Sequence, residues 1–167
     1  MSDPGTISLV VRDAVPSDLA QVVRFNSALA FETESKALDF TILEAGVSQA
    51  LAEPDQRLRY WVVESLGQVV GQAAISREWS DWRNGWIWWL QSVYVGAEHR
   101  RCGVFRALIS HIRRTAELEK NVIGLRLYVE HANLHAQQVY RAAGFEPGGY
   151  QVYEQIWGNL INSPSGD

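Results

Sequence analysis

Three strand-like segments, followed by a strand–helix–strand unit, constrain the fold of this chain more than any other feature. Residues 58–65, 69–79 and 86–95 are rich in β-branched and aromatic side chains, and short turns at 66–68 and 80–85 separate them. Strands joined by tight turns are antiparallel. Residues 103–119 have helical periodicity and lead into a strand at 122–130, which a right-handed crossover places parallel to the strand at 86–95. The sequence therefore predicts a mixed, mostly antiparallel sheet.

The flanking segments extend this pattern in both directions. We expect a first strand at 7–12, two helices at about 16–29 and 38–52 around a polar break at 30–36, a helix at 133–143 and a last strand at 150–157. The predicted order is β-α-α-β-β-β-α-β-α-β, an α/β (α+β) fold with helices on both faces of the sheet. We expect one domain over residues 1–167, with a core at about 7–157 and a flexible tail at 158–167.

Composition and charge narrow the possible environments and partners. The chain has 167 residues, a formal net charge of -4 and one cysteine, Cys102, so no internal disulfide can form and the field of the whole molecule does not favour nucleic acid. The first residues lack a signal-peptide pattern, and no apolar run is long enough to span a membrane, so we expect a cytoplasmic protein without membrane partners. His131 and His135 lie four residues apart, but no third ligand is evident nearby, and no metal is expected.

A basic loop between a strand and a helix is the most informative local feature. Arg100, Arg101 and Arg106 surround Gly103, where the helix at 103–119 begins. The first N–H groups of a helix have no internal partner, and with the helix dipole they favour an anion. Glycine lets the backbone approach a bulky ligand closely. The pattern predicts a pyrophosphate-binding loop, although an ordinary helix start with solvated arginines remains an alternative.

The same residues resemble motif A of the GNAT N-acetyltransferase superfamily. Val93-x-Val95 precedes Arg100-x-x-Gly103 with the spacing of that motif. The resemblance implies that the backbone near Val93 and Val95 pairs with the pantetheine arm of acetyl-CoA. It also implies that main-chain N–H groups hold the pyrophosphate, here those of Arg101, Cys102, Gly103, Val104, Phe105 and Arg106. Phe105 stands where the motif has Gly or Ala, and we interpret its side chain as core packing of the helix.

A second segment resembles motif B of the same family. Asn133 begins a helix that contains Tyr140 and ends at Gly144-Phe145. By resemblance, Asn133 contributes to the coenzyme site and Tyr140 stands beside the coenzyme sulfur as general acid. The alternative for Tyr140 is an aromatic side chain that only packs in the core. The resemblance covers roughly residues 7–157.

The residues that would activate an amine are less defined by the sequence. Some relatives use a glutamate at the position of Trp89, which cannot act as a base. The remaining candidates are Glu34, which we favour, then Glu32 and Glu78, and each could instead be a solvated surface charge. Gln91 is expected to share a strand face with Val93 and Val95, where it could orient a water molecule or the acceptor.

The resemblance implies an acetyl-CoA-dependent N-acetyltransferase. Its expected acceptor is a primary amine, with a small molecule favoured, and transfer is expected to be direct within a ternary complex because Cys102 lies in the phosphate loop. A non-catalytic acyl-CoA sensor and a dimeric interaction module remain alternatives. Five tryptophans lie near one hairpin: Trp79, Trp82, Trp86, Trp88 and Trp89. We interpret them as core packing or a homodimer interface, in preference to a wall of the substrate site.

Overall fold

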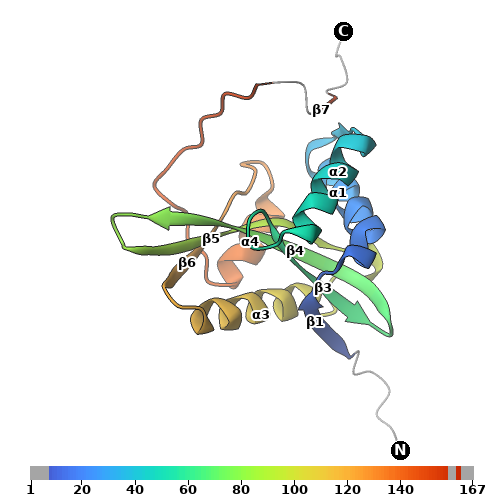
Figure 1. Ribbon diagram of the computed structural model, residues 1–167, viewed down its shortest axis with the longest axis horizontal. Helices are drawn as coiled ribbons and strands as arrows, with labels where there is room; N and C mark the ends of the chain where they lie inside the picture. The colour runs from blue at the N-terminus through green and yellow to red at the C-terminus, as the bar shows by residue number, and fades with distance from the viewer. Residues whose placement is uncertain (1–7, 158–160, 163–167) are drawn as a thin grey trace, which may run out of the picture.

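A five-stranded sheet organises the molecule (Figure 1), in a computed structural model that describes residues 8–157 and Ile161–Asn162. The strand order is β1-β3-β4-β5-β6. Neighbours are antiparallel except β5 and β6, which are parallel as the crossover predicted. The strands are β1 (Leu9–Asp13), β3 (Arg59–Ser65), β4 (Gln68–Ser80), β5 (Gly85–Val95) and β6 (Val122–Leu127). A separate antiparallel pair joins β2 (Ala37–Leu38) to β7 (Ile161–Asn162).

Helices cover both faces of this sheet, as expected. On one face lie α1 (Leu19–Glu34), preceded by a 3-10 turn at Pro16–Asp18, and α2 (Phe40–Ala52). On the other lies α3 (Val104–Leu118), and Tyr140 of α4 (Leu134–Ala142) packs against the same core cluster as α3. Figure 1 shows α1 and α2 above the sheet and α3 below it. These two sides are called the α1 face and the α3 face below.

Each face carries its own hydrophobic core. On the α3 face, Leu108 and Ile112 pack against Trp61 and Trp88, and both tryptophans are fully buried. On the α1 face, Val22 and other buried residues of α1 and α2 pack against β3 and β4. Full burial of one large apolar side chain contributes about 1.5–3 kcal/mol. The central strands β3 and β4 are therefore packed on both faces, and β5 is packed on the α3 face.

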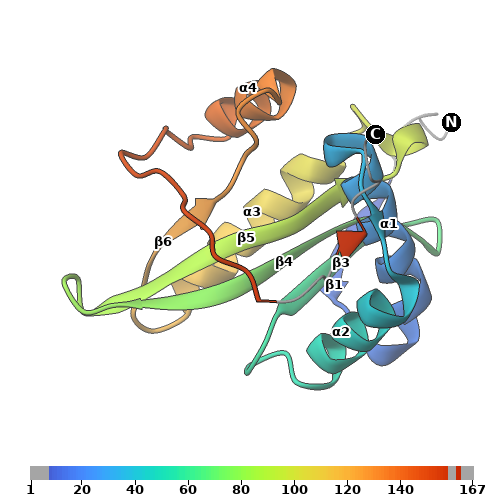
Figure 2. The ribbon, with the colours of Figure 1, turned by 90° about the horizontal axis from the view of Figure 1, so that it is seen from above.

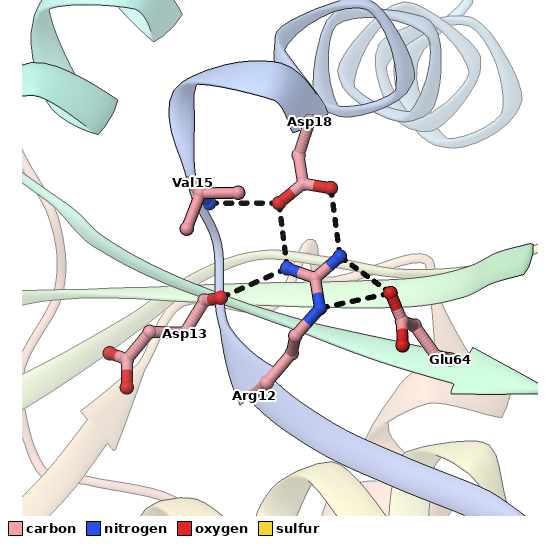
Figure 3. Close-up of polar contacts among 5 residues, drawn as sticks. All are labelled: Arg12, Asp13, Val15, Asp18 and Glu64. Atoms are coloured by element: carbon pink, nitrogen blue, oxygen red, sulfur yellow. Dashed lines mark hydrogen bonds and ion pairs between the residues drawn. The ribbon is translucent and has the colours of Figure 1, made fainter. Parts of the chain in front are cut away.

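A charged cluster connects the first strand to the start of α1 (Figure 3). Arg12 donates two hydrogen bonds to Asp18, at 2.8 and 3.0 Å, and two to Oε1 of Glu64 on β3, at 2.9 and 2.6 Å. Asp18 is buried and also accepts a hydrogen bond from the backbone N–H of Val15. The Arg12 guanidinium lowers the pKa of Asp18 through these hydrogen bonds. The cluster holds the turn before α1 against the edge of the sheet.

The first helix is longer than the sequence predicted. α1 continues to Glu34, so the expected polar break at 30–36 is wrong for most of its length. Ala30, Phe31 and the two glutamates continue the helix, which ends where Ser35 takes a left-handed φ of 53°. Glu32 and Glu34 therefore lie in the last turn of α1. Asp39 caps α2, its carboxylate accepting from the N–H of Ile42.

The expected last strand is also wrong. Residues 150–157 form neither helix nor strand, and β6 ends at Leu127, three residues earlier than predicted. Because no described strand lies beside residues 150–157, their apolar side chains remain exposed. The expected tail at 158–167 lies outside the described residues apart from β7. None of the described helices has the length and apolar character that crossing a membrane requires.

Candidate functional site

β5 and β6 separate halfway along β5. They pair from Trp86 and Val122 to Leu90 and Leu127, and β5 then continues to Val95 while the chain after β6 turns toward α4. Along this edge of β5, no strand of the described residues lies beside it beyond Leu90. Strand backbone that lacks a neighbour can form main-chain hydrogen bonds with an extended ligand. The separated edge can therefore pair with a linear molecule that contains amide groups.

A β-bulge at Ser92 changes which side chains point to each face near the end of β5. The pairing of β5 with β4 shifts register there, and Ser92 has a φ of 51°. Val93 and Val95 pack on the α3 face, whereas Gln91 lies opposite Ala74, which belongs to the core under α1 and α2. The expectation that Gln91 shares a face with Val93 and Val95 is therefore wrong, because the extra residue interrupts the alternation.

The loop before α3 presents a row of unpaired main-chain donors. Arg101 and Gly103 have positive φ values of 64° and 82°. Ala107 is the first residue of α3 whose backbone N–H has a backbone acceptor, the carbonyl of Gly103. Among the described residues, no N–H group from Arg101 to Arg106 has a backbone acceptor, and α3 has no side-chain cap. A Cβ at Gly103 would meet only Leu9 Cδ1, at 4.0 Å, so the glycine faces open space. This arrangement fits a diphosphate.

The three arginines of the loop have different roles. Arg101 and Arg106 are exposed and make no ion pair within the described part of the chain. Arg100 instead turns toward α1, where it binds Oε2 of Glu32 at 2.6 Å, donates to the Val95 carbonyl at 3.1 Å and covers the ring of Tyr94. Arg101 and Arg106 therefore remain available for an anion, while Arg100 attaches the loop to α1.

Glu32 is held by two partners that its position in α1 brings together. The Tyr94 hydroxyl donates to Oε1 at 2.6 Å, and Arg100 binds Oε2. The hydrogen bond from Tyr94, with that from Arg100, lowers the pKa of Glu32, and burial raises the pKa of Tyr94. A carboxylate with a lowered pKa is a weak base. Glu32 therefore connects α1 to β5 and the loop.

A buried chain of amides lies beneath this contact. Gln72, which is fully buried, donates from Nε2 to Oδ1 of Asn26 at 2.8 Å and to the carbonyl of Ser92 at 3.2 Å. Asn26 donates in turn to the hydroxyl of Tyr60. Because a buried N–H donor without a partner is costly, the two hydrogen bonds from Gln72 Nε2 favour this position of the bulge. The chain therefore positions the Ser92 backbone at the separation of β5 and β6.

A polar and aromatic group lies on the α1 face where β4, β5 and β6 meet. Glu78 accepts from Trp89 Nε1 at 2.5 Å and from Arg126 at 3.0 Å. The ring of Trp89 stacks on Tyr128 with centroids 4.4 Å apart. Gln91 donates to the hydroxyl of Ser76 at 2.6 Å, one step further along the same face. The structure thus brings together three predicted site residues: Glu78, Trp89 and Gln91.

Tyr140 and Asn133 occupy the helix that follows β6. The ring of Tyr140 packs edge-on against Phe105 at the start of α3 and against Phe145, with centroids 5.8 and 5.9 Å apart. Its hydroxyl has no hydrogen-bond partner among the described residues, and burial raises its pKa. Asn133 caps α4 by accepting from the N–H of Ala136. The contact with Phe105, which packs against the α3 core as predicted, puts Tyr140 beside the loop.

Other predicted residues lie apart from these groups or at the surface. Glu34 binds Lys36 at 2.5 Å at the exposed end of α1. Cys102 is exposed in the loop. Alternation of Trp86 and Trp88 to one face and Trp89 to the other is confirmed, but Trp82 is 85% exposed, so core packing does not account for every tryptophan of the hairpin. Within the described residues, no three side chains of His, Cys, Asp or Glu gather to hold a metal ion.

Several contributing residues were missed by the sequence analysis. Tyr94 lies between two valines of a strand, and that alternation could have placed it on the α1 face. Gln72 interrupts an apolar strand, and Arg126 lies between two leucines. A polar residue in such a position often has a structural or functional role. Asn26 and Tyr128 carried no comparable signal, because only the folded chain brings each to its partner.

Comparisons with known proteins place this geometry in a family. The sequence matches the family model described as Acetyltransferase (GNAT) family over residues 24–145. A comparison with curated proteins finds no match.

Among solved structures, a possible acetyltransferase from Clostridium difficile 630 is similar with a TM-score of 0.84 and 37% identity, covering 92% of this chain and 100% of that chain. Two others share the fold. A predicted acetyltransferase with acetyl-CoA from Clostridium acetobutylicum has a TM-score of 0.72 at 17% identity, covering 89% and 96% of the two chains. The ribosomal-protein-alanine N-acetyltransferase from Brucella melitensis biovar Abortus 2308 has a TM-score of 0.72 at 15% identity, covering 90% and 100%. The chain belongs to the GNAT acetyltransferase family.

Proposed function

We propose that this chain transfers the acetyl group of acetyl-CoA to a primary amine of a small molecule, by direct attack within a ternary complex. The observation that carries the proposal is the row of unpaired N–H groups from Arg101 to Arg106, which begins where β5 and β6 have already separated. A diphosphate bound at the loop and a linear arm along β5 would direct a thioester toward the bulge at Ser92.

The residues of the loop are suited to binding and not to chemistry. Their N–H groups would hold the two phosphates, and the exposed guanidinium groups of Arg101 and Arg106 would add positive charge. Asn133, whose side chain caps α4, would contribute to the coenzyme site from the start of that helix. Cys102, in this loop, would lie at the diphosphate and away from the thioester, which supports direct transfer over an acyl-enzyme.

Transfer requires two proton movements. The amine nitrogen attacks the thioester carbonyl, the carbon–sulfur bond breaks, and the amine loses a proton while the departing thiolate gains one. Tyr140 would donate the proton to sulfur, because burial raises its pKa and keeps the hydroxyl protonated, and because that hydroxyl has no other partner within the described residues. Solvent would then return a proton to the phenolate.

The base is assigned differently from the sequence ranking. Glu34, the first choice from sequence, pairs with Lys36 at the surface. The hydrogen bonds from Tyr94 and Arg100 lower the pKa of Glu32, which makes it a weaker base. Glu78 lies on the α1 face with Trp89 and Gln91. An acceptor that approached β5 from this face, opposite α3, would reach these three side chains. Glu78 would accept the amine proton, directly or through a water molecule that Gln91 orients.

A thiol-release assay across an amine panel tests the proposal. The panel should contain polyamines, amino acids, an aminoglycoside and a peptide with a free N-terminus. Release of coenzyme A with a mass gain of one acetyl group on a small amine is the expected result. Acetylation of the peptide alone would redirect the proposal to protein acceptors. Tight binding of acetyl-CoA without turnover on any amine would favour the non-catalytic sensor, for which the tryptophan at position 89 is the motivating observation.

A further inference from the structure

The ion pair between Glu78 and Arg126 lies next to the point where the sheet opens. Arg126 is paired with Trp89, one residue before Leu90 and Leu127, the last pair between β5 and β6. The side chain of Arg126 is 32% exposed and that of Glu78 is 43% exposed. In Figure 2, which looks down on the α1 face, α1 and α2 lie over the β1 and β3 side of the sheet. No helix of the described chain covers the hairpin end of β4 and β5 there, so an acceptor can reach the ion pair.

Both members of the pair can form further hydrogen bonds. Arg126 donates to Glu78 from Nη1, its one hydrogen bond among the described residues, which leaves the donors on Nη2 and Nε. Oε1 of Glu78 accepts from Arg126 and Oε2 from Trp89, and a carboxylate oxygen can accept more than one hydrogen bond. The pair can therefore bind an anionic group at Arg126 and a cationic group at Glu78 without being broken.

Stability alone gives this pair a small role. The strands that carry it, β4 and β6, are each already paired with β5 through the main chain. Partly exposed ion pairs of this kind contribute little to the free energy of folding. The ion pairs of Glu119 differ, because that carboxylate holds Arg59 with one oxygen and Arg77 with the other and so connects the end of α3 to β3 and β4.

An aromatic surface continues from the ion pair. The ring of Trp89 lies between the guanidinium of Arg126, 5.7 Å from its centroid, and the ring of Tyr128, stacked at 4.4 Å. Tyr128 is 58% exposed, so part of its ring is open to a ligand. Such a surface next to two opposite charges suits a ligand whose apolar side chain is attached close to its own charged groups.

We propose that the acceptor is an α-amino acid with an apolar side chain and that Arg126 determines this specificity; the proposal rests on the acetyltransferase function proposed above. The acceptor carboxylate binds Nη2 and Nε of Arg126, and its ammonium group lies against Glu78. These two protein groups are 3.0 Å apart, so the charges of the ligand must also be adjacent. An α-amino acid carries both on one carbon, whereas a polyamine has no carboxylate and an ω-amino acid separates the two.

The same arrangement accounts for the protons of the reaction. One ammonium proton passes to Glu78 and then to solvent, and the neutral nitrogen attacks the thioester carbonyl carbon. The nitrogen loses its second proton as the carbon–sulfur bond breaks, and the thiolate takes a proton from Tyr140, which solvent replaces. The N-acetyl product keeps its carboxylate and has lost the positive charge that held it to Glu78.

Matched acceptors test the proposal. Leucine, methionine and phenylalanine are compared with their amides and with their decarboxylated amines, using release of coenzyme A to obtain kcat/KM. For at least one side chain, the wild-type protein should prefer the amino acid by about 10- to 100-fold, the range expected for hydrogen bonds to a charged group. Arg126→Gln should reduce this ratio to near one, and Arg126→Lys should restore part of it. A ratio cancels any general effect on Glu78, because the compared acceptors both use it.

Arg77→Gln is the matched control. Arg77 precedes Glu78 on β4 but binds Glu119 on the α3 face, so its removal should leave the ratio unchanged. A wild-type protein that acetylates the amides or decarboxylated amines as well as the amino acids would overturn the proposal and leave the acetyltransferase function intact. A preference that survives in Arg126→Gln would also overturn it. Lack of turnover on every amine, including polyamines and aminoglycosides, would instead refute the proposed function itself.

Discussion

Leu90 and Leu127 form the last pair between β5 and β6, and five further residues of β5 extend beyond them to Val95. This pair marks the point where the sheet opens. Above it lie the bulge at Ser92 and the loop that begins α3, and both depend on contacts outside β5 itself. In the proposed function, the opening of the sheet and the unpaired N–H groups would together bind an extended ligand that carries phosphate at one end.

A bulky side chain at the start of α3 should block the coenzyme. Gly103→Trp is expected to weaken coenzyme A binding by at least about 100-fold, because the indole would fill the space in front of the free N–H groups. Gly67→Trp is the matched control. Gly67 has a similar φ of 77°, a Cβ added there would meet no atom within 4 Å, and it lies in the turn between β3 and β4, outside the loop before α3. Equilibrium dialysis measures both. Equal binding by the two variants would show that the loop is misplaced.

Removing the Tyr140 hydroxyl should slow the reaction without weakening coenzyme binding. Tyr140→Phe is expected to lower kcat by roughly 100-fold, the low end of general acid catalysis, with KM for acetyl-CoA nearly unchanged. Burial raises the pKa of Tyr140, so its acid form persists as pH rises, and the wild-type rate should not fall between pH 7 and 9 through loss of this proton. Steady-state kinetics over that range check the expectation. An unchanged kcat would reduce Tyr140 to a packing residue.

The two candidate bases can be separated by amide substitutions. Glu78→Gln should lower kcat by about 10-fold or more, because the amide cannot accept a proton, while its one oxygen can keep one of the two contacts with Trp89 and Arg126. Glu34→Gln should have the smaller effect, since Glu34 contacts Lys36 at the surface. Turnover of the best amine in the panel is the measurement. The reverse ranking would restore Glu34 as the base.

The Arg12–Asp18 contact should stabilise the fold in a pH-dependent way. Asp18→Asn is expected to lower the free energy of unfolding by about 1–3 kcal/mol at pH 7, because Asp18 is buried and bonded to a cation. Arg12 lowers the pKa of Asp18, so this stabilisation is present above the ordinary carboxyl pKa near 4 and is lost as pH falls through the lower folded value.

Urea unfolding at pH 7 and at pH 3 checks this, with the exposed Asp81→Asn as control. The difference between wild type and Asp18→Asn should shrink at pH 3. A difference of the same size at both values would mean that the charge of Asp18 is not responsible.

Local patterns predicted most of the fold because local physics determines most of it. The β3–β4–β5 meander, the crossover through α3 and the buried stripe containing Leu108 and Ile112 follow from turn residues and periodicity. The length of α1 did not, because nothing between Ala30 and Glu34 breaks a helix, and its end depends on a left-handed Ser35. The polar residues at 30–36 therefore did not indicate where the helix ends.

The site was less predictable than the fold. Spacing predicted that a basic loop precedes α3, and the structure has this loop with Tyr140 packed on Phe105 beside it. The orientation of Gln91, in contrast, depended on a bulge that Gln72 supports from another strand. Arg100 was expected to add charge at the phosphate site, and its contact with Glu32 joins residues that are distant in sequence. Such long-range contacts leave no local signal, whereas the loop amides follow from the start of a helix.

Isothermal titration calorimetry of the folded chain with coenzyme A and with acetyl-CoA tests the central claim most directly. Main-chain N–H groups at the start of α3 should bind the diphosphate of both ligands, with a dissociation constant in the micromolar range and one site per chain. Dephospho-coenzyme A, which keeps the diphosphate, should bind comparably, and pantetheine, which lacks it, should bind far more weakly. Absence of heat with millimolar coenzyme A, from protein that unfolds cooperatively, would contradict the account.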